Sequence, residues 1–286
     1  MNGQDLKNWI LDFDVATSRP LVLGILNLTP DSFWDGGHYT TLKNSLNRVE
    51  QMIDEGVDIL DIGGESTRPG SIRIDVKTEY ERVIPIVQAI RKEFDIAISI
   101  DTYKPEMMHA ALDVGADMIN DVCALETTAA VEIIQSYGVP VCLMHISGNL
   151  NDLATAKESE NIIEDIDDFF QKKIAYLLGH GVNIKQIIID PGMGFGKSLK
   201  NNLKIIQDLD SLTHFNCPLL MGLSRKRFIG QVLDRVTEQR LIGTVAANLM
   251  SYLRGARIFR VHDIQETKDS LTMAEAIIKN KERAFL

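Results

Sequence analysis

The chain has 286 residues, of which 45% are hydrophobic and 24% charged, and its formal net charge is -10. This composition is typical of a folded globular protein and argues against a disordered chain. A negative net charge repels nucleic acids and anionic membrane surfaces, so we expect neither as a partner. No stretch reaches about 18 uncharged apolar residues, so we predict no membrane-spanning helix and expect a cytoplasmic protein.

The cysteines predict reduced thiols. Cys123, Cys142 and Cys217 are odd in number and lack CxxC spacing. Free thiols in apolar surroundings fit this pattern better than a disulfide framework or a zinc site.

Eight short apolar runs predict β-strands. They are rich in Val, Ile and Leu without strict alternation, which is typical of parallel strands buried on both faces. The runs are 21–28, 58–63, 96–101, 117–122, 140–145, 186–190, 218–223 and 256–261.

Longer segments with helical spacing separate these runs. They are 42–55, 78–93, 105–114, 126–137, 160–179, 199–211, 237–254 and 265–280. Several end at a glycine, such as Gly56 or Gly138, where a left-handed residue ends a helix. Eight strand-helix units favour an α/β fold of the (β/α)8 TIM-barrel type over an open, doubly wound sheet.

The composition does not change along the chain, so we expect a single domain over residues 1–286. Residues 1–19 form an N-terminal extension before the first strand. We expect this extension to make a short hairpin or a helix across the bottom of the barrel.

Each strand ends at or beside a residue suited to chemistry. The C-terminal ends of parallel barrel strands meet at one face, so residues far apart in sequence are expected to share one pocket. These residues are Asn27, Asp61, Asp101, Asn120, His145, Asp190, Lys226, Arg260 and His262.

Three of these residues are acceptors for hydrogen bonds. Asp101, Asn120 and Asp190 end the third, fourth and sixth strands. Together they suit a ligand with several N–H donors, such as an amino-oxo heterocycle. The alternative for each residue alone is a cap on the following helix.

The loops after the strands contain features suited to phosphate and to aromatic rings. Glycines and hydroxyls surround Arg68 in the loop 63–70, where a guanidinium matches phosphate oxygens, although an ordinary surface turn has the same composition. Phe195 lies between glycines in the loop 190–197 and fits either a flat substrate or the core. Residues 224–228 and 260–262 concentrate positive charge where barrel enzymes commonly hold phosphate, the alternative being a solvated basic surface.

The histidines predict no metal chemistry. His145 ends the fifth strand, where a lone histidine is more often structural. The sequence contains no HExxH motif and no cluster of His with carboxylates, which argues against a transition-metal site.

Seven segments, read in order, resemble the motif series of the dihydropteroate synthase family, enzymes of the folate pathway. They lie between residues 21 and 264 and are GILNLTPDSFWDGG, DIGGESTRPG, SIDTYKP, INDV, IIDPGMGFGK, LSRKRFIG and RVHD. The resemblance implies a (β/α)8 barrel, usually a homodimer. It also implies the joining of 6-hydroxymethyl-7,8-dihydropterin diphosphate to p-aminobenzoate, with release of pyrophosphate assisted by Mg2+.

The resemblance also implies a role for each motif residue. The pterin-binding residues would be Asp101, Asn120, Asp190 and Lys226. The diphosphate-binding residues would be Asn27, Thr67, Arg68, Arg260 and His262, with Asn27 also a ligand of Mg2+. The p-aminobenzoate-binding residues would be Pro69, Phe195, Lys226 and Arg227. The catalytic residues would be Asp35, Arg68, Asp101 and Lys226.

Two other interpretations stay open at this point. The pterin-binding module of a corrinoid methyltransferase has the same barrel and a similar acidic pocket, but it does not need the STRP loop or the basic segments for a diphosphate. A non-catalytic paralogue that binds pterin or a protein partner is the third interpretation. Pyrophosphate release in the presence of both substrates separates the three.

Overall fold

The computed structural model describes residues 1–28, 38–66, 73–148, 153 and 158–278. Within these residues the chain alternates between strands and helices, as the sequence predicts.

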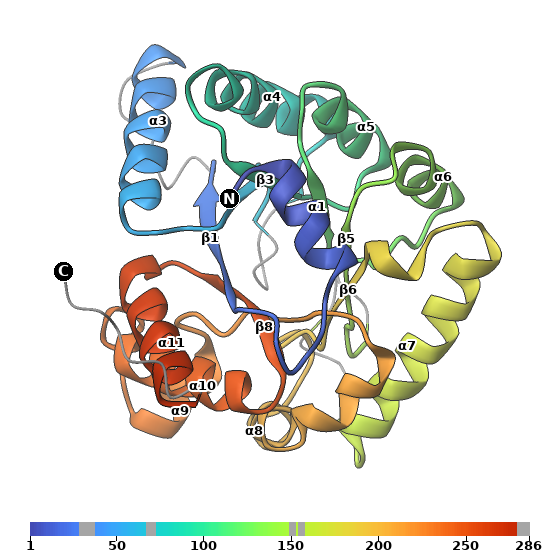
Figure 1. The fold of residues 1–286 in the computed structure, drawn as a ribbon, viewed down its shortest axis with the longest axis vertical. Coiled ribbons are helices and arrows are strands. Elements are labelled where there is room, and N and C mark those ends of the chain that lie inside the picture. Colours follow the sequence, from blue (N-terminus) through green and yellow to red (C-terminus); the bar gives the residue numbers. More distant parts are fainter. Residues whose placement is uncertain (29–37, 67–72, 149–152, 154–157, 279–286) are drawn as a thin grey trace.

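Eight parallel strands form a closed barrel in chain order, with β8 paired to β1 (Figure 1). Each strand ends within two residues of its predicted end. The strands are β1 (Leu21–Asn27), β2 (Ile59–Gly63), β3 (Ala97–Asp101), β4 (Met118–Asp121), β5 (Val141–Met144), β6 (Ile187–Asp190), β7 (Leu219–Met221) and β8 (Ala256–Val261).

Most of the helices form a ring around the barrel (Figure 1). The ring helices are α3 (His38–Asp54), α4 (Val76–Glu93), α5 (Pro105–Asp113), α6 (Thr128–Tyr137), α7 (Ile162–Gly179), α8 (Leu199–Gln207), α9 (Arg227–Leu233), α10 (Leu241–Leu253) and α11 (Ile264–Ile278). Short 3-10 helices are η2 (Ile184–Gln186), η3 (Leu209–Phe215) and η4 (Thr237–Gln239). None of the helices in the described residues is long and apolar enough to cross a membrane.

The extension before β1 forms a helix, α1 (Gly3–Leu11), which crosses one end of the barrel (Figure 1). Its first turn is fixed by a capping box, in which Asn2 and Asp5 exchange hydrogen bonds between side chain and backbone. Leu6 and Ile10 are fully buried, and they pack against the first inward-facing residues of all eight strands. Of the two expectations for residues 1–19, the helix across the barrel bottom is therefore confirmed.

The barrel interior changes from apolar to polar along the strands. Near α1 it holds residues such as Ile59, Ala97 and Ile258. Two residues further on, the same strands carry Asp61, Ser99 and Arg260. The alternate residues face outward and pack against the ring of helices. Polar chemistry is therefore confined to the C-terminal end of the barrel.

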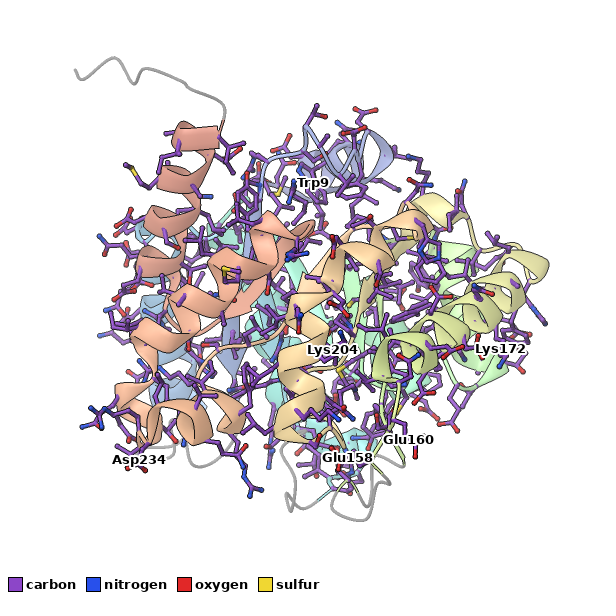
Figure 2. All side chains as sticks on the ribbon, turned by 90° about the horizontal axis from the view of Figure 1, so that it is seen from below. Trp9, Glu158, Glu160, Lys172, Lys204 and Asp234 are labelled. Atoms are coloured by element: carbon purple, nitrogen blue, oxygen red, sulfur yellow. The ribbon has the colours of Figure 1, made fainter. Side chains whose placement is uncertain are left out.

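Figure 2 shows the two ends from the side. Trp9 of α1 lies at one end of the molecule, whereas Asp234 and Glu158, which belong to loops after strands, lie at the other.

The helix predictions need two corrections after β7. The sequence analysis assigned no helix to α9, whose seven residues are too few for a periodic pattern. The helix expected at 237–254 is divided at Arg240 into η4 and α10.

Candidate active site

Arg260 joins two carboxylates at the centre of the barrel mouth. Its Nε donates to Asp61 Oδ2 at 2.6 Å, and its Nη2 donates to Asp101 Oδ2 at 2.6 Å. Asp61 is fully buried, so the guanidinium supplies the opposite charge that its carboxylate would otherwise lack. The aspartates come from β2 and β3 and the arginine from β8, so closure of the barrel assembles this group.

Asp61 organises the residues around it. Ser99 Oγ donates to Asp61 Oδ1 at 2.7 Å, and Asn120 Nδ2 donates to Asp61 Oδ2 at 3.3 Å. The amide nitrogen of Asn120 is thereby engaged, which leaves its carbonyl oxygen as an acceptor for a ligand. The sequence placed Asp61 at a strand end but gave it no role.

Asp101 keeps one oxygen free for a ligand. Within the described part of the chain, Asp101 Oδ1 is buried and has no hydrogen-bond partner. Burial raises the pKa of Asp101 to about 7, although Arg260 opposes this shift. A buried acceptor without a partner is costly, so this atom suits an N–H donor of a bound molecule.

Asp190 and Lys226 form the opposite side of the mouth. A Cβ atom on Gly222 would lie 3.8 Å from Lys226 Nζ and 3.9 Å from Asp190 Oδ2, so both groups converge there. Burial raises the pKa of Asp190 and lowers that of Lys226 to about 8, and each shift is opposed by the charge of the other group. Arg260 also acts electrostatically on both, which places them in the same charged cluster.

The loop after β6 holds the side chain of Lys226. Lys226 Nζ donates to the carbonyl oxygen of Met193 and lies 4.7 Å from the ring centroid of Phe195. This is a cation-π contact, and it settles the alternatives for Phe195 in favour of the mouth rather than the core.

The basic run 224–227 divides into residues with different surroundings. Arg225 has a φ of 55° and forms two hydrogen bonds to Asp263, at 2.9 and 2.6 Å, so it is held in a structural ion pair. Lys226 turns into the mouth, whereas Arg227 is exposed as the first residue of α9. The alternative of a solvated surface therefore does not apply to Lys226.

His262 lies beside the loop after β7. Its backbone N–H donates to Ser224 Oγ at 3.1 Å, and its Nδ1 lies 2.9 Å from the same oxygen. The hydroxyl of Ser224 thus fixes the imidazole at the edge of the mouth.

Asn27 ends β1 next to Asp101. A Cβ atom on Gly63 would lie 3.9 Å from Asn27 Oδ1 and 3.5 Å from Asp101 Cβ. An amide oxygen at this position is suitable for Mg2+, which usually takes one or two protein oxygens together with substrate phosphates and water. The described residues contain no group of three or more His, Cys, Asp or Glu side chains that could hold a metal by themselves.

Glu65, in the loop after β2, belongs to a network of charged side chains. Arg73 Nη1 donates to Glu65 Oε1 at 2.7 Å, and Lys104 Nζ donates both to Glu65 Oε2 and to Glu79 Oε2 at 2.6 Å. Burial favours the neutral acid, but the hydrogen bonds from Arg73 and Lys104 lower the pKa of Glu65. The sequence analysis missed this network, because its members lie in three separate segments.

Four residues with expected roles lie outside the described residues. They are Asp35, Thr67, Arg68 and Pro69.

His145 is buried beside the mouth and contacts the ring of Phe169 at 5.2 Å between centroids. Burial lowers its pKa to about 3, so the imidazole is neutral at physiological pH. This is consistent with its assignment as a structural residue.

A cavity of about 640 Å³ lies beside the ends of β4 and β5. It is lined by Met144 and Val122 from the ends of β5 and β4, and by Tyr103, Cys123 and Lys173. Of the charged residues described above, only Arg73 lines it, so this cavity is distinct from the cluster around Arg260.

Comparisons with known proteins agree with this geometry. Residues 23–262 match the family of pterin binding enzymes. The dihydropteroate synthase of Escherichia coli is 42% identical over 265 residues, which cover 93% of this chain and 94% of that protein.

Two solved structures of dihydropteroate synthase from Xanthomonas albilineans are also similar. The one with 4-aminobenzoic acid has a TM-score of 0.86 and 42% identity, covering 91% of this chain and 93% of that chain. The one in complex with 7,8-dihydropteroate has a TM-score of 0.83 and 38% identity, covering 93% of this chain and 95% of that chain. The chain therefore belongs to the pterin binding enzyme family, among its dihydropteroate synthases.

Proposed function

We propose that the protein joins 6-hydroxymethyl-7,8-dihydropterin diphosphate to p-aminobenzoate, giving 7,8-dihydropteroate and pyrophosphate. The observation that carries this proposal is the convergence of Asp101, Asn120, Asp190 and Lys226 on one mouth, with a buried carboxylate oxygen that lacks a donor among the described residues. The ligands of the two Xanthomonas relatives are the second substrate and the product of the same reaction.

The pterin would be recognised by its N–H groups. Asp101 Oδ1 and the amide oxygen of Asn120 accept hydrogen bonds from one side, and the carboxylate of Asp190 accepts from the other. Lys226 donates to an acceptor on the ring. Because this pocket is buried, each unmatched group would cost binding energy, which gives selectivity for the amino-oxo heterocycle.

The diphosphate would lie at the cationic side of the mouth. Asn27, Arg260 and His262 surround this position, and we place Thr67 and Arg68 there by family resemblance. Among the described residues, Arg260 uses its Nε and one N–H of Nη2 for the two aspartates, so both N–H groups of Nη1 and the second one of Nη2 can donate to a phosphate oxygen. Mg2+ held through Asn27 would neutralise negative charge on the diphosphate.

The p-aminobenzoate would bind between Phe195, Lys226, Pro69 and Arg227. The bond from the pterin methylene carbon to the diphosphate oxygen would break first, and the amine nitrogen of p-aminobenzoate would then bond to that carbon. The bonding electrons leave with pyrophosphate, and the new secondary amine loses one proton. We propose a dissociative substitution without a protein nucleophile, with Asp35 and Arg68 completing the site from the loops after β1 and β2.

The direct test supplies purified protein with both substrates and Mg2+. We expect stoichiometric pyrophosphate and dihydropteroate, measured by coupled phosphate release and by mass spectrometry. Tight binding of pterin without either product would instead support a non-catalytic paralogue. Pterin binding together with methyl transfer to a corrinoid would support the methyltransferase.

We also propose that the protein is a homodimer, as the family resemblance implies. Large apolar side chains are exposed on α9, α10 and α11 and in the segment between α9 and α10, and α10 contacts both other helices. These helices lie side by side on one flank of the barrel (Figure 1). We name the exposed side chains the α10 face: Val232, Leu233, Val236, Ile242, Met250, Leu253, Met273 and Ile277. Many exposed apolar side chains on neighbouring helices are typical of a subunit interface.

We place the enzyme in the cytoplasm. Cys142 and Cys217 are buried and Cys123 is half-buried, and all three are free thiols, as the sequence predicts. Reduced cysteines are typical of that compartment.

A further inference from the structure

Lys197 is a half-buried lysine whose hydrogen bonds, among the described residues, all go to backbone carbonyls. Its Nζ donates to Gly192 O at 2.8 Å, to His145 O at 3.1 Å and to Phe195 O at 3.3 Å. These three bonds use all the donors of an ammonium group. The lysine therefore ties the end of β5 to the loop after β6.

The tied loop carries two contacts of Lys226. Met193 O accepts from the ammonium group of Lys226, and the ring of Phe195 lies beneath it. Both residues lie between Gly192 and Lys197, within the segment that Lys197 closes.

The loop is packed tightly against the end of β5. Gly192 has a φ of 70°, and a Cβ atom there would lie 1.8 Å from His145 O. On the other side, the N–H of Ser147 donates to Phe195 O at 3.3 Å. The loop backbone therefore has little room to shift. Because Lys197 also bonds to the carbonyl oxygens of Gly192 and Phe195, we expect its bonds to help fix the position of the Phe195 ring.

Burial lowers the pKa of Lys197 to about 7. Among the described residues its hydrogen-bond partners are carbonyl oxygens and not carboxylates, so no ion pair offsets the desolvation of the charged form.

We propose that Lys197 is a positioning residue for the p-aminobenzoate subsite, acting through the loop 191–197 on Phe195 and Lys226. The inference rests on the proposed function, because it assigns the ring of Phe195 to the arylamine. Lys197 itself does not touch the substrate.

The test compares Lys197→Met with Lys185→Met, a matched change at an exposed lysine just before β6. We expect Lys197→Met to raise the KM for p-aminobenzoate at least about tenfold, because small misplacements of positioning groups have effects of that order. The Kd of the pterin diphosphate, measured by calorimetry, should change less than about threefold, because Asp101 and Asn120 still hold the ring. Lys185→Met should leave both values unchanged.

A double-mutant cycle tests the route of action. If Lys197 acts through Phe195, the variant with both Lys197→Met and Phe195→Ala should have the KM of Phe195→Ala alone, within about twofold. The proposal would be overturned if the KM of the double variant rose by the product of the two single-variant factors. It would also be overturned if Lys197→Met left the KM unchanged.

Two further measurements keep the result interpretable. Lys197→Gln retains two donors, and it replaces Lys197→Met if that variant does not fold. Hydrogen exchange in the peptide over residues 191–197 should be faster in either variant, whether or not the protein is active, and unaltered exchange would contradict the proposal. A wild-type protein that forms no product would refute the proposed function, which is a separate outcome.

Discussion

At the scale of single residues, the mouth places three buried aspartates against two cations. Asp61 and Asp101 share Arg260, and Asp190 lies across from Lys226. Buried charges are tolerated when they are paired and hydrogen-bonded, yet Asp101 retains an oxygen without a donor in the described part of the chain. This imbalance of acceptors over donors favours a ligand rich in N–H groups and an electron-poor methylene carbon.

Substitutions at this cluster should abolish most of the activity. We expect Asp101→Asn or Lys226→Ala to reduce product formation at least about 10²-fold, the scale of losing one contact to the transition state. Asp168→Asn and Lys172→Ala, which alter an exposed ion pair on α7, are the matched controls. Near-wild-type turnover in both site variants would refute the assignment of these residues.

The buried charges also predict a bell-shaped pH profile for kcat/KM. Below about pH 7, Asp101 gains a proton and its free oxygen is no longer a charged acceptor. Above about pH 8, Lys226 loses its proton and its charge. Steady-state rates across this range should therefore fall on both sides of a maximum between the two values. Lys226→Arg should shift the alkaline limb of the profile to higher pH, because a guanidinium stays protonated there. If the alkaline limb stays at the same pH, a group other than Lys226 causes it.

The sequence was sufficient to name the residues at the strand ends, because each interrupts an apolar run. It was not sufficient to pair them. The hydrogen bond between Arg260 and Asp61 joins residues 199 positions apart, and only closure of the barrel brings β8 beside β1. The three carbonyls that hold Lys197 are equally invisible in sequence, because backbone atoms carry no residue signature.

At the scale of elements, the loop 191–197 is shaped by its first glycine. Gly192→Ala would place a methyl group against His145 O and force an alanine to a φ of 70°. We expect this change to lower the free energy of unfolding by more than about 2 kcal/mol, from backbone strain and overpacking.

A glycine in open space provides the comparison. Gly179, at the end of α7, has no atom within 4 Å of the position that a methyl group would take. Gly179→Ala should be neutral or stabilising by up to about 1 kcal/mol, because alanine favours the helix. Denaturant titrations of both variants give the two values, and equal effects would mean that the contact with His145 O carries no cost.

Strand positions were predictable and helix ends less so. A strand buried on both faces is a continuous apolar run, whereas the amphipathic spacing of a helix continues into neighbouring turns. The segment 199–211 shows this, because α8 ends at Gln207 and η3 continues the apolar spacing in a tighter turn. The short helix α9 was not predicted for a related reason. Its seven residues make about two turns, which is too short for the apolar spacing to be distinguished from that of a loop.

At the scale of the whole molecule, the α10 face should control association. We expect Ile242→Glu and Met273→Glu to convert a dimer of twice 32.0 kDa to a 32.0 kDa monomer, measured by light scattering. A charge buried in an apolar interface without a partner disfavours the complex. Tyr80→Glu, an exposed aromatic on α4, should leave the mass unchanged. A wild-type protein that is already monomeric would contradict the dimer.

Because α1 seals the far end of the barrel with Leu6 and Ile10, a molecule reaches the interior through the mouth. A substrate that binds deep in the mouth therefore has to bind before the substrate that lies above it, and it leaves after that substrate has gone. The aspartates that would hold the pterin reach further down the strands than Phe195, so we expect ordered kinetics in which the pterin diphosphate precedes the arylamine. An inhibitor that occupies the outer position would then trap the inner molecule rather than compete with it.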